Sequence, residues 1–305
     1  MRVENSKLLA AFADLGVEHR GAERLAEWTS LAVGGETDIL LIHQPRHLPE
    51  LVRALAAEGV PWRFLGGGTN LLVRDAELPW VLLYLSPPEA HPEFRGHRVR
   101  VPAAADLGRT VMECARQNLG GMEGLIGVPG SVGGALRMNA GAYGTEISQF
   151  VRSVELFRTD TGRIEALPAS AIGFQYRRTS LGPGDIMIGA ELELPGKPYD
   201  EIRAAIKVCN QKRRASQPLN EKSAGCIFKN PPGASAGKMI DELGLKGHRV
   251  GGAVVSERHA NFFINRFQAT ADDLVRLIDF IKQRIHQAFG YELEEEVIVW
   301  SDESD

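Results

Sequence analysis

The sequence predicts an α+β protein of two domains. Its 305 residues correspond to roughly two domains of ~150 residues, and 44% of them are hydrophobic, enough to bury a full core. Residues 38–73 have the strand–helix–strand pattern of a βαβ unit, whereas residues 151–194 have the alternation and hairpin turn of neighbouring strands. The segment Pro195-Gly196-Lys197-Pro198 interrupts these patterns. We therefore expect a first domain over residues 1–197 and a second over residues 198–305.

The composition argues against several classes of partner. Lys and Arg number 35 against 39 Asp and Glu, the net charge is −4, and no segment collects basic residues, so we expect no nucleic-acid partner. The first thirty residues lack a signal-peptide pattern, and the longest apolar runs, such as residues 81–85, are far below the ~20 residues that span a bilayer. Three cysteines and eight histidines form no CxxC, HxH or HExxH motif. We expect a cytoplasmic protein without membrane insertion or a metal site.

The elements of the first domain are predicted from apolar periodicity. Short apolar runs or strict alternation predict strands, and apolar residues at i, i+3, i+4 and i+7 predict helices. In chain order these are strand 38–42, helix 48–55, strands 62–65, 71–73 and 98–102, helix 106–118, and strands 151–157, 163–167 and 186–194. Residues 120–144 have no such period but carry too many apolar residues for an exposed linker, so we expect them to pack against the domain.

The second domain is predicted to contain two helices and a final strand. A helix over residues 200–214 begins with an Asp that can cap it and ends in a basic triplet. A loop rich in Gly and Pro follows at residues 223–233. A helix over residues 270–289 has a capping-box pattern before its apolar stripe and a Gly after it. The last predicted strand, residues 291–300, contains four glutamates.

Two glycine-rich turns of the first domain are candidates for ligand binding. Residues 66–70 offer adjacent backbone N–H groups, a hydroxyl and an amide, which suits the phosphates of a nucleotide. The chain returns to a strand afterwards, so this is neither a GxGxxG nor a GxxxxGK[ST] motif, and a tight structural turn is the alternative. A second glycine-rich segment at residues 124–135 favours a large cofactor that contains a pyrophosphate.

Three further groups would carry chemistry only if they meet in one pocket. Cys226 lies in a loop of non-core composition, and a free thiol, with a pKa of about 8.5, gives up a proton more readily than a hydroxyl; a small buried hydrophobe is the alternative. If they do not meet in a pocket, residues 176–178 are simply a solvated basic pair, and residues 294–296 are the charged end of a strand. Residues 212–214 complement a helix dipole, which is the favoured interpretation, or receive an anionic substrate.

Seven segments together resemble the UDP-N-acetylenolpyruvoylglucosamine reductase family, also called UDP-N-acetylmuramate dehydrogenase. In the family's order they are TSLAVGG (29–35), LGGGTNLLV (65–73), GVPGSVGGA (127–135), MNAGAYG (138–144), YR (176–177), SAGCIFKNP (223–231) and HANF (259–262). The resemblance implies an FAD-binding domain of the vanillyl-alcohol-oxidase (PCMH) type, with two α/β subdomains divided near residues 66–75. It also implies a smaller α/β substrate-binding domain whose C-terminal strand returns to the active site.

The resemblance implies that NADPH, through FAD, reduces the enolpyruvyl ether of UDP-N-acetylglucosamine to UDP-N-acetylmuramate, a peptidoglycan precursor. Hydride transfer creates an enolate, which needs a fixed cation and then a general acid. By motif, Arg177 is the cation, Glu296 is its polar companion, and Cys226 replaces the proton-donating serine of many members. The implied FAD contacts are Gly66, Gly67, Gly68, Thr69, Asn70, Gly130, Ser131, Gly133, Gly134, Asn139 and Ala140. The implied substrate contacts are Tyr176, Lys212, Arg213, Gln217 and Asn230.

The sequence departs from the family pattern in two places. The family commonly has Pro before the catalytic Glu-Val, whereas three glutamates precede Val297 here. Glu296 is chosen because it precedes Val297, and Glu294 and Glu295 remain alternatives. Only 48 residues separate Arg177 from Cys226, which leaves no room for the loop with a substrate-closing tyrosine that some members insert. The chain therefore resembles the short subclass, in which another element must close the site.

Two other functions are compatible with the flavin loops. One is an oxidase or dehydrogenase of the same fold acting on a sugar or hydroxy acid, because fold alone does not determine function. The other is a non-catalytic sensor of flavin or nucleotide. Neither needs a cation, an acid and a glutamate in the motif positions of Arg177, Cys226 and Glu296, so we favour the reductase.

Overall fold

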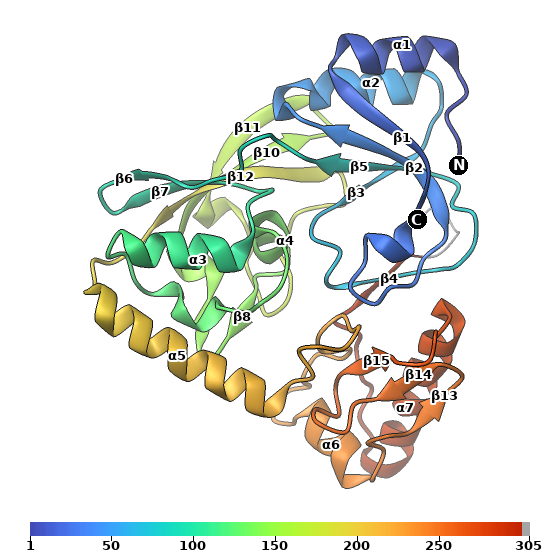
Figure 1. Cartoon of the computed structure of the whole chain (residues 1–305), viewed down its shortest axis with the longest axis vertical. Helices are drawn as coiled ribbons and strands as arrows, with labels where there is room; N and C mark the ends of the chain where they lie inside the picture. Colours follow the sequence, from blue (N-terminus) through green and yellow to red (C-terminus); the bar gives the residue numbers. More distant parts are fainter. Residues whose placement is uncertain (301–305) are drawn as a thin grey trace.

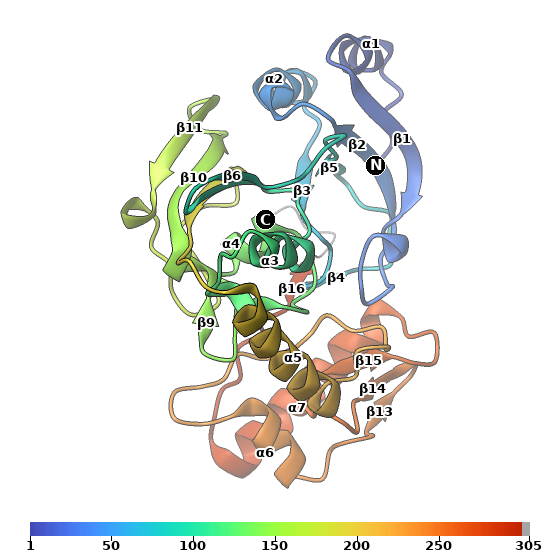
Figure 2. The ribbon, with the colours of Figure 1, turned by 60° about the vertical axis from the view of Figure 1, so that its left-hand side comes forward.

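The computed structural model describes residues 1–300, in which three groups of elements occupy different regions (Figure 1). We call them the N-terminal subdomain (residues 1–85), the middle subdomain (residues 93–194) and the C-terminal unit (residues 217–297). Helix α5 (Tyr199–Ser216) runs from the middle subdomain to the C-terminal unit (Figure 2). No helix within residues 1–300 is long and apolar enough to cross a membrane, and no group of His, Cys, Asp or Glu in this range is arranged to hold a metal.

The N-terminal subdomain is a four-stranded sheet, in the order β1-β2-β5-β3, with two helices. Its elements are α1 (Ser6–Asp14), β1 (Val17–Arg24), β2 (Glu36–Ile42), α2 (Leu48–Ala57), β3 (Trp62–Leu65) and β5 (Val81–Leu85). Both faces of β2 are buried: Leu40 and Ile42 pack in the cluster that contains α2, whereas Ile39 and Leu41 pack with Trp80. The predicted strands β2 and β3 are parallel to β5, which lies between them, so they are not neighbours.

The strand that follows the first glycine-rich turn leaves this sheet. It is β4 (Leu71–Val73), and it pairs in parallel with β16 (Ile298–Trp300) from the end of the described chain (Figure 2). The predicted strand over residues 291–300 is therefore a strand only in its last three residues. The residues before β16 form no regular strand, and Glu296 among them bonds both to Ile227 and to Asn70.

The middle subdomain is a five-stranded antiparallel sheet, in the order β11-β10-β12-β7-β6. Its strands are β6 (Glu93–Arg95), β7 (Arg98–Pro102), β10 (Val151–Arg158), β11 (Arg163–Pro168) and β12 (Asp185–Glu193). The other elements are α3 (Leu107–Arg116), α4 (Val132–Arg137), and the hairpin strands β8 (Gly141–Ala142) and β9 (Thr145–Glu146). Short 3₁₀ helices occur at η1 (Leu25–Glu27), η2 (Pro45–His47), η3 (Met122–Leu125), η4 (Ile147–Phe150) and η5 (Ala169–Ala171).

The aperiodic segment 120–144 packs against this sheet, as predicted. Leu125, Val132 and Leu136 are fully buried in the core of the middle subdomain. The sequence missed α4 within this segment, because a helix of six residues is too short to show a period and its two glycines have low helix propensity.

The C-terminal unit is a small three-stranded sheet with two helices. Its elements are α6 (Ala236–Glu242), β13 (Arg249–Val250), β14 (Ala253–Val255), β15 (Phe263–Asn265) and α7 (Ala271–Phe289). Thr270 and Asp273 form the predicted capping box of α7, and Gly290, at φ 72°, ends the helix in the left-handed region. Helix α5 buries Ile202 and Ile206 in the core of the middle subdomain. The domain boundary near residue 197 remains a prediction.

Candidate active site

The two predicted glycine-rich turns lie against each other, and we call residues 66–70 with 130–134 the glycine cradle. A Cβ atom on Gly67 would lie 2.6 Å from the Cα atom of Gly130. A Cβ atom on Gly130, where φ is +109°, would lie 2.7 Å from Thr69 Oγ1. On Gly68, at φ +63°, it would overlap the carbonyl oxygen of Trp28. Close approach of two backbones therefore explains why the cradle is built from glycine.

The cradle offers backbone donors to a ligand. Within residues 1–300, no protein acceptor bonds to the N–H groups of Gly67, Gly68, Thr69 and Ser131. Successive N–H groups of this kind form anion-binding concavities, and the adjoining glycines leave room for a bulky phosphate. This donor set fits the pyrophosphate of FAD.

Other residues predicted to contact FAD have scaffold roles in this structure. Gly133 N–H donates to the Ala103 carbonyl at 2.8 Å, and Gly134 N–H donates to Ser131 Oγ at 3.2 Å, which caps α4. The buried side chain of Asn139 donates to the Gln175 carbonyl at 3.1 Å and also bonds to Glu146 and Ser148. Ala140 N–H donates to the Ala135 carbonyl at 2.7 Å. Their contact with FAD remains a prediction.

Arg177, Cys226 and Glu296 are brought together from three distant segments, and we call them the Arg–Glu–Cys cluster. Arg177 Nε lies 2.6 Å from Glu296 Oε1, and the two side chains are 20% and 16% exposed. The thiol of Cys226 is close enough to both for each to shift its pKa. Burial, aided by the charge of Glu296, raises the pKa of Cys226 to about 12, and Arg177 and Arg213 oppose that rise. The thiol is therefore neutral and holds its proton at neutral pH.

Arg177 is held by contacts with Tyr176 and with the segment that contains β8. Its φ of +57° lies in the left-handed region, which costs energy for a residue with a side chain and persists only when surrounding contacts enforce it. Arg177 Nη2 donates to the Gly141 carbonyl at 2.9 Å, and its guanidinium carbon lies 5.1 Å from the ring centroid of Tyr176. The bond from Asn139 to the Gln175 carbonyl fixes the start of this loop.

Glu296 lies between the two halves of the site. Its backbone N–H donates to the Ile227 carbonyl at 2.7 Å, beside Cys226. Its carbonyl accepts from Asn70 Nδ2 of the glycine cradle at 2.9 Å. Burial raises the pKa of the Glu296 carboxyl group, and Arg177 and Lys229 oppose the rise. One residue thus connects the Cys226 loop, the cradle and Arg177.

The neighbouring glutamates have other partners. Glu294 is largely exposed and forms an ion pair with Lys229. Glu295 forms an ion pair with Lys282 of α7 at 2.8 Å. Of the three glutamates that the sequence left as alternatives, Glu296 is the one that pairs with Arg177.

The position of Cys226 depends on a residue that the sequence analysis did not assign. Asn261, from the HANF segment, is buried and bonds to both the N–H and the carbonyl of Phe228, at 3.0 and 2.8 Å. Cys226 itself forms an isolated β-bridge with Phe262. The signal in the sequence was a single amide in an otherwise apolar stretch, which is typical of a buried residue that satisfies backbone groups.

The predicted substrate residues are divided between buried and exposed positions. Arg213 is 7% exposed and donates to Gln217 Oε1 at 2.9 Å. Its guanidinium carbon lies 5.6 Å from the ring centroid of Tyr143. Lys212 and Tyr176 are exposed. Asn230 is exposed, and its Oδ1 accepts from the N–H of Ala236, the first residue of α6.

Tyr143 lies beside the candidate site, and sequence reasoning missed it. It occupies the turn between β8 and β9, has a φ of +52° and is 42% exposed. Its ring faces the buried cation Arg213, which is close enough to the Cys226 sulfur to affect its pKa. The MNAGAYG segment contained this residue, but nothing in a glycine-rich stretch predicts which neighbour its aromatic ring will meet.

Known proteins match nearly the whole length of this chain. A family model described as an FAD binding domain matches residues 39–167, and one described as the C-terminal domain of UDP-N-acetylenolpyruvoylglucosamine reductase matches residues 217–300. The UDP-N-acetylenolpyruvoylglucosamine reductase 2 of Symbiobacterium thermophilum is 41% identical over 284 residues, 92% of each chain. The reductase of Geobacter metallireducens is 40% identical, over 96% of this chain and 98% of that one. The crystal structure of UDP-N-acetylenolpyruvylglucosamine reductase from Thermus caldophilus has a TM-score of 0.81 at 38% identity and covers 93% of this chain and 99% of that one.

These matches and the glycine cradle define an FAD-dependent oxidoreductase, whose FAD-binding domain is of the vanillyl-alcohol-oxidase (PCMH) type. The α+β class predicted from the sequence is confirmed. The chain belongs to the UDP-N-acetylenolpyruvoylglucosamine reductase family. Between Arg177 and Cys226 the chain contains β12 and α5, without an inserted loop of the kind that carries a closing tyrosine.

Proposed function

We propose that the protein reduces UDP-N-acetylglucosamine enolpyruvate to UDP-N-acetylmuramate, a precursor of bacterial peptidoglycan, with NADPH as the reductant. Bound FAD would accept hydride from NADPH and pass it to the enolpyruvyl group. The names of the relatives support the substrate, and the Arg177–Glu296 pair beside the Cys226 thiol is the observation that carries the chemistry. The partners are small molecules, with no nucleic acid and no membrane insertion, and we propose that the protein acts in the cytoplasm.

The glycine cradle would hold the pyrophosphate of FAD. Gly66, Asn70 and Gly130 shape the cradle, and the N–H groups of neighbouring residues supply donors without any side chain in the way. The carboxamide of Asn70 is already engaged by Glu296, so this residue would connect the cofactor site to the Arg–Glu–Cys cluster.

Arg177 would stabilise the charge that develops during hydride transfer. When hydride adds to the terminal carbon of the enolpyruvyl group, the electron pair of the double bond moves toward the carboxylate and forms an enolate. Arg177 is already oriented by Glu296 and by the Gly141 carbonyl, so little reorganisation is needed when the charge appears.

Cys226 would then protonate the adjacent carbon. The S–H bond breaks, a C–H bond forms, and a thiolate remains until solvent returns a proton. The free-thiol pKa of about 8.5 that sequence reasoning used does not apply here, because burial raises it to about 12. Arg177 and Arg213 each lower this pKa, which means that each stabilises the thiolate left by the transfer.

The UDP part of the substrate would bind near the end of α5. Arg213 and Gln217 are bonded to each other there, and the charge of Arg213 suits a diphosphate. We propose Tyr176, Lys212 and Asn230 as further substrate contacts. Because these three are exposed, substrate binding would have to bury them.

An anaerobic visible spectrum tests the whole proposal. The purified protein should show flavin absorbance that NADPH bleaches and that enolpyruvyl-UDP-N-acetylglucosamine restores. If NADPH bleaches the flavin but the substrate does not restore it, another oxidoreductase reaction of the same fold is favoured. Protein that binds no added FAD would contradict the cofactor assignment.

A further inference from the structure

The turn at residues 29–35 matches the family but has no role in the chemistry above. It lies between η1 and β2 of the N-terminal subdomain, yet two of its side chains are buried in the core of the C-terminal unit. Leu31 and Val33 belong to the same apolar cluster as Leu277 and Ile281 of α7. The turn is therefore a segment of one region that is docked into another.

A buried amide fixes the docked turn. Asn265, at the end of β15, donates from Nδ2 to the carbonyls of Leu31 and Ala32, at 2.9 and 3.3 Å, and accepts from Ala269 N–H at 2.7 Å. Ala32 has a φ of +53°, which a residue with a side chain rarely adopts, so the path of the turn is imposed by its surroundings. Without the Asn265 amide, the buried carbonyl of Leu31 and the partly buried carbonyl of Ala32 would lose this donor.

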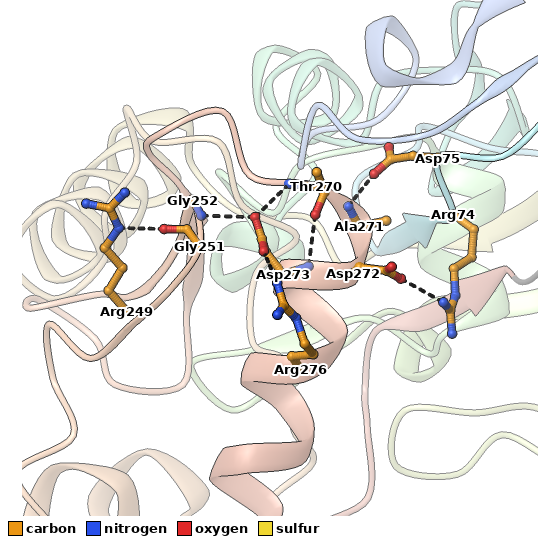
Figure 3. Close-up of polar contacts among 10 residues, drawn as sticks. All are labelled: Arg74, Asp75, Arg249, Gly251, Gly252, Thr270, Ala271, Asp272, Asp273 and Arg276. Carbon is orange, nitrogen blue, oxygen red and sulfur yellow. Dashed lines mark hydrogen bonds and ion pairs between the residues drawn. The ribbon is translucent and has the colours of Figure 1, made fainter.

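A carboxylate fixes the same junction from the other side (Figure 3). Asp75, just after β4, accepts from Gly34 N–H at 3.0 Å and from Ala271 N–H, at the start of α7, at 2.5 Å. Its charge also complements the positive end of the α7 dipole. Arg74 Nη1 adds an ion pair to Asp272 at 2.8 Å.

The C-terminal unit supplies a second carboxylate near the same end of α7. Asp273 accepts from the N–H groups of Gly252 and Thr270, at 3.0 and 3.1 Å, so it caps α7 without contacting the N-terminal subdomain (Figure 3). Asp75 is exposed and its bond to Ala271 crosses the junction, whereas Asp273 is buried, bonds within the C-terminal unit and also pairs with Arg276.

The junction is connected to both halves of the active site. Ser30 N–H donates to the Gly68 carbonyl of the glycine cradle at 3.0 Å. Arg74 N–H donates to the Trp300 carbonyl of β16 at 3.1 Å, four residues after Glu296. A cavity of about 640 Å³ beside the turn is lined in part by Gly34, Asp75 and Asn265. The turn is therefore not closely packed on this side, and its position there depends on the hydrogen bonds of Asp75 and Asn265.

We propose that Asn265 and Asp75 are positioning residues that set where Cys226 and Glu296 lie relative to the glycine cradle and Arg177. They do this by seating the turn 29–35 on the C-terminal unit. This inference rests on the proposed function, because it requires that groups of both regions act on one substrate. A small misplacement of reacting groups can lower a rate ~100-fold even when the change lies far from the chemistry.

The test compares Asn265→Ala and Asp75→Asn with the control Asp273→Asn, all as full-length protein loaded with FAD. Each is reduced with NADPH and mixed with enolpyruvyl-UDP-N-acetylglucosamine, and flavin reoxidation is followed by stopped flow at a temperature where all variants are folded. Both junction variants should slow reoxidation by roughly 10- to 100-fold, with bound FAD retained. The control should stay close to the unaltered protein, although it also weakens the α7 cap. Equal slowing in Asp75→Asn and Asp273→Asn, or no slowing in Asp75→Asn, would overturn the proposal.

Hydrogen exchange provides a second readout that does not depend on activity. The N–H groups of Glu296 and Ile298 donate to Ile227 and Asn70, and they should exchange faster in Asp75→Asn but not in Asp273→Asn. Unchanged protection would overturn the positioning role. Failure of the substrate to reoxidise the unaltered protein would instead contradict the proposed function, and the exchange result would still decide the role of Asp75. If Asn265→Ala does not fold, Asp75→Asn decides both experiments.

Discussion

The glycine cradle and the Arg–Glu–Cys cluster are built in opposite ways. The cradle is made by backbone from two turns of the flavin-binding domain, and it depends on the absence of side chains, as the approach of Gly67 to Gly130 shows. The cluster is made by side chains of Arg177, Cys226 and Glu296, which come from three distant segments and are half-buried beside one another.

This difference separates two kinds of failure. A side chain added in the cradle should alter the affinity for FAD, because it pushes apart the two turns that form the cradle. A change in the cluster should leave FAD bound and alter the rate at which the reduced protein acts on substrate. The following changes, from the largest expected effect to the smallest, test this separation.

Cys226→Ala should leave flavin reduction by NADPH nearly intact and slow reoxidation by the substrate, since loss of a general acid typically costs ~10²–10⁴-fold. Stopped-flow absorbance separates the two half-reactions. Cys226→Ser is the matched variant, and it should keep measurable turnover because a hydroxyl can still donate a proton. Near-normal reoxidation in Cys226→Ala would exclude this thiol as the donor.

Gly67→Ala should weaken FAD binding, because the new Cβ would lie 2.6 Å from backbone that cannot move easily. Overpacking typically costs about 1–3 kcal/mol, which corresponds to roughly 5- to 150-fold in Kd. Gly182→Ala is the control, since its Cβ would have its nearest contact at 3.7 Å and its φ is not in the left-handed region. Titration of the apoprotein with FAD measures both, and equal affinities would show that the cradle tolerates a side chain.

Glu296→Gln should slow reoxidation by roughly 10- to 100-fold, because Arg177 loses the partner that orients it. Glu294→Gln and Glu295→Gln remove only the ion pairs to Lys229 and Lys282, so they should have little effect. Equal losses in all three would contradict the choice of Glu296. The same Gln variant should also lower the pKa of Cys226, which the ultraviolet absorbance of the thiolate reports.

The pH dependence should be shallow. The reacting form of Cys226 is the thiol, which is fully present well below its pKa and disappears as the pH rises through about 12. The rate of reoxidation by substrate should therefore not fall between neutral pH and about pH 10, whereas a thiol of ordinary pKa, about 8.5, would lose activity over that range. Single-turnover rates across this interval make the measurement, and a fall centred near pH 8.5 would show that burial does not protect this proton.

The sequence by itself determined the local features. The capping box and final glycine specify α7, the apolar runs specify β2 and β3, and the spacing of glycines marks both turns of the cradle, because each depends on residues close together in the chain. The seven family segments also indicated the family, which the comparisons confirm.

Only the tertiary structure decided which distant groups meet. The parallel pairing of β4 with β16 brings residue 296 to residue 70, and no local pattern contains that information. Of the three glutamates, the tertiary structure places only Glu296 against Arg177, and it buries Arg213 while leaving Lys212 exposed. The same packing raises the pKa of Cys226. Burial and charge pairing are properties of the assembled environment, so they arise only when segments far apart in the chain are packed together.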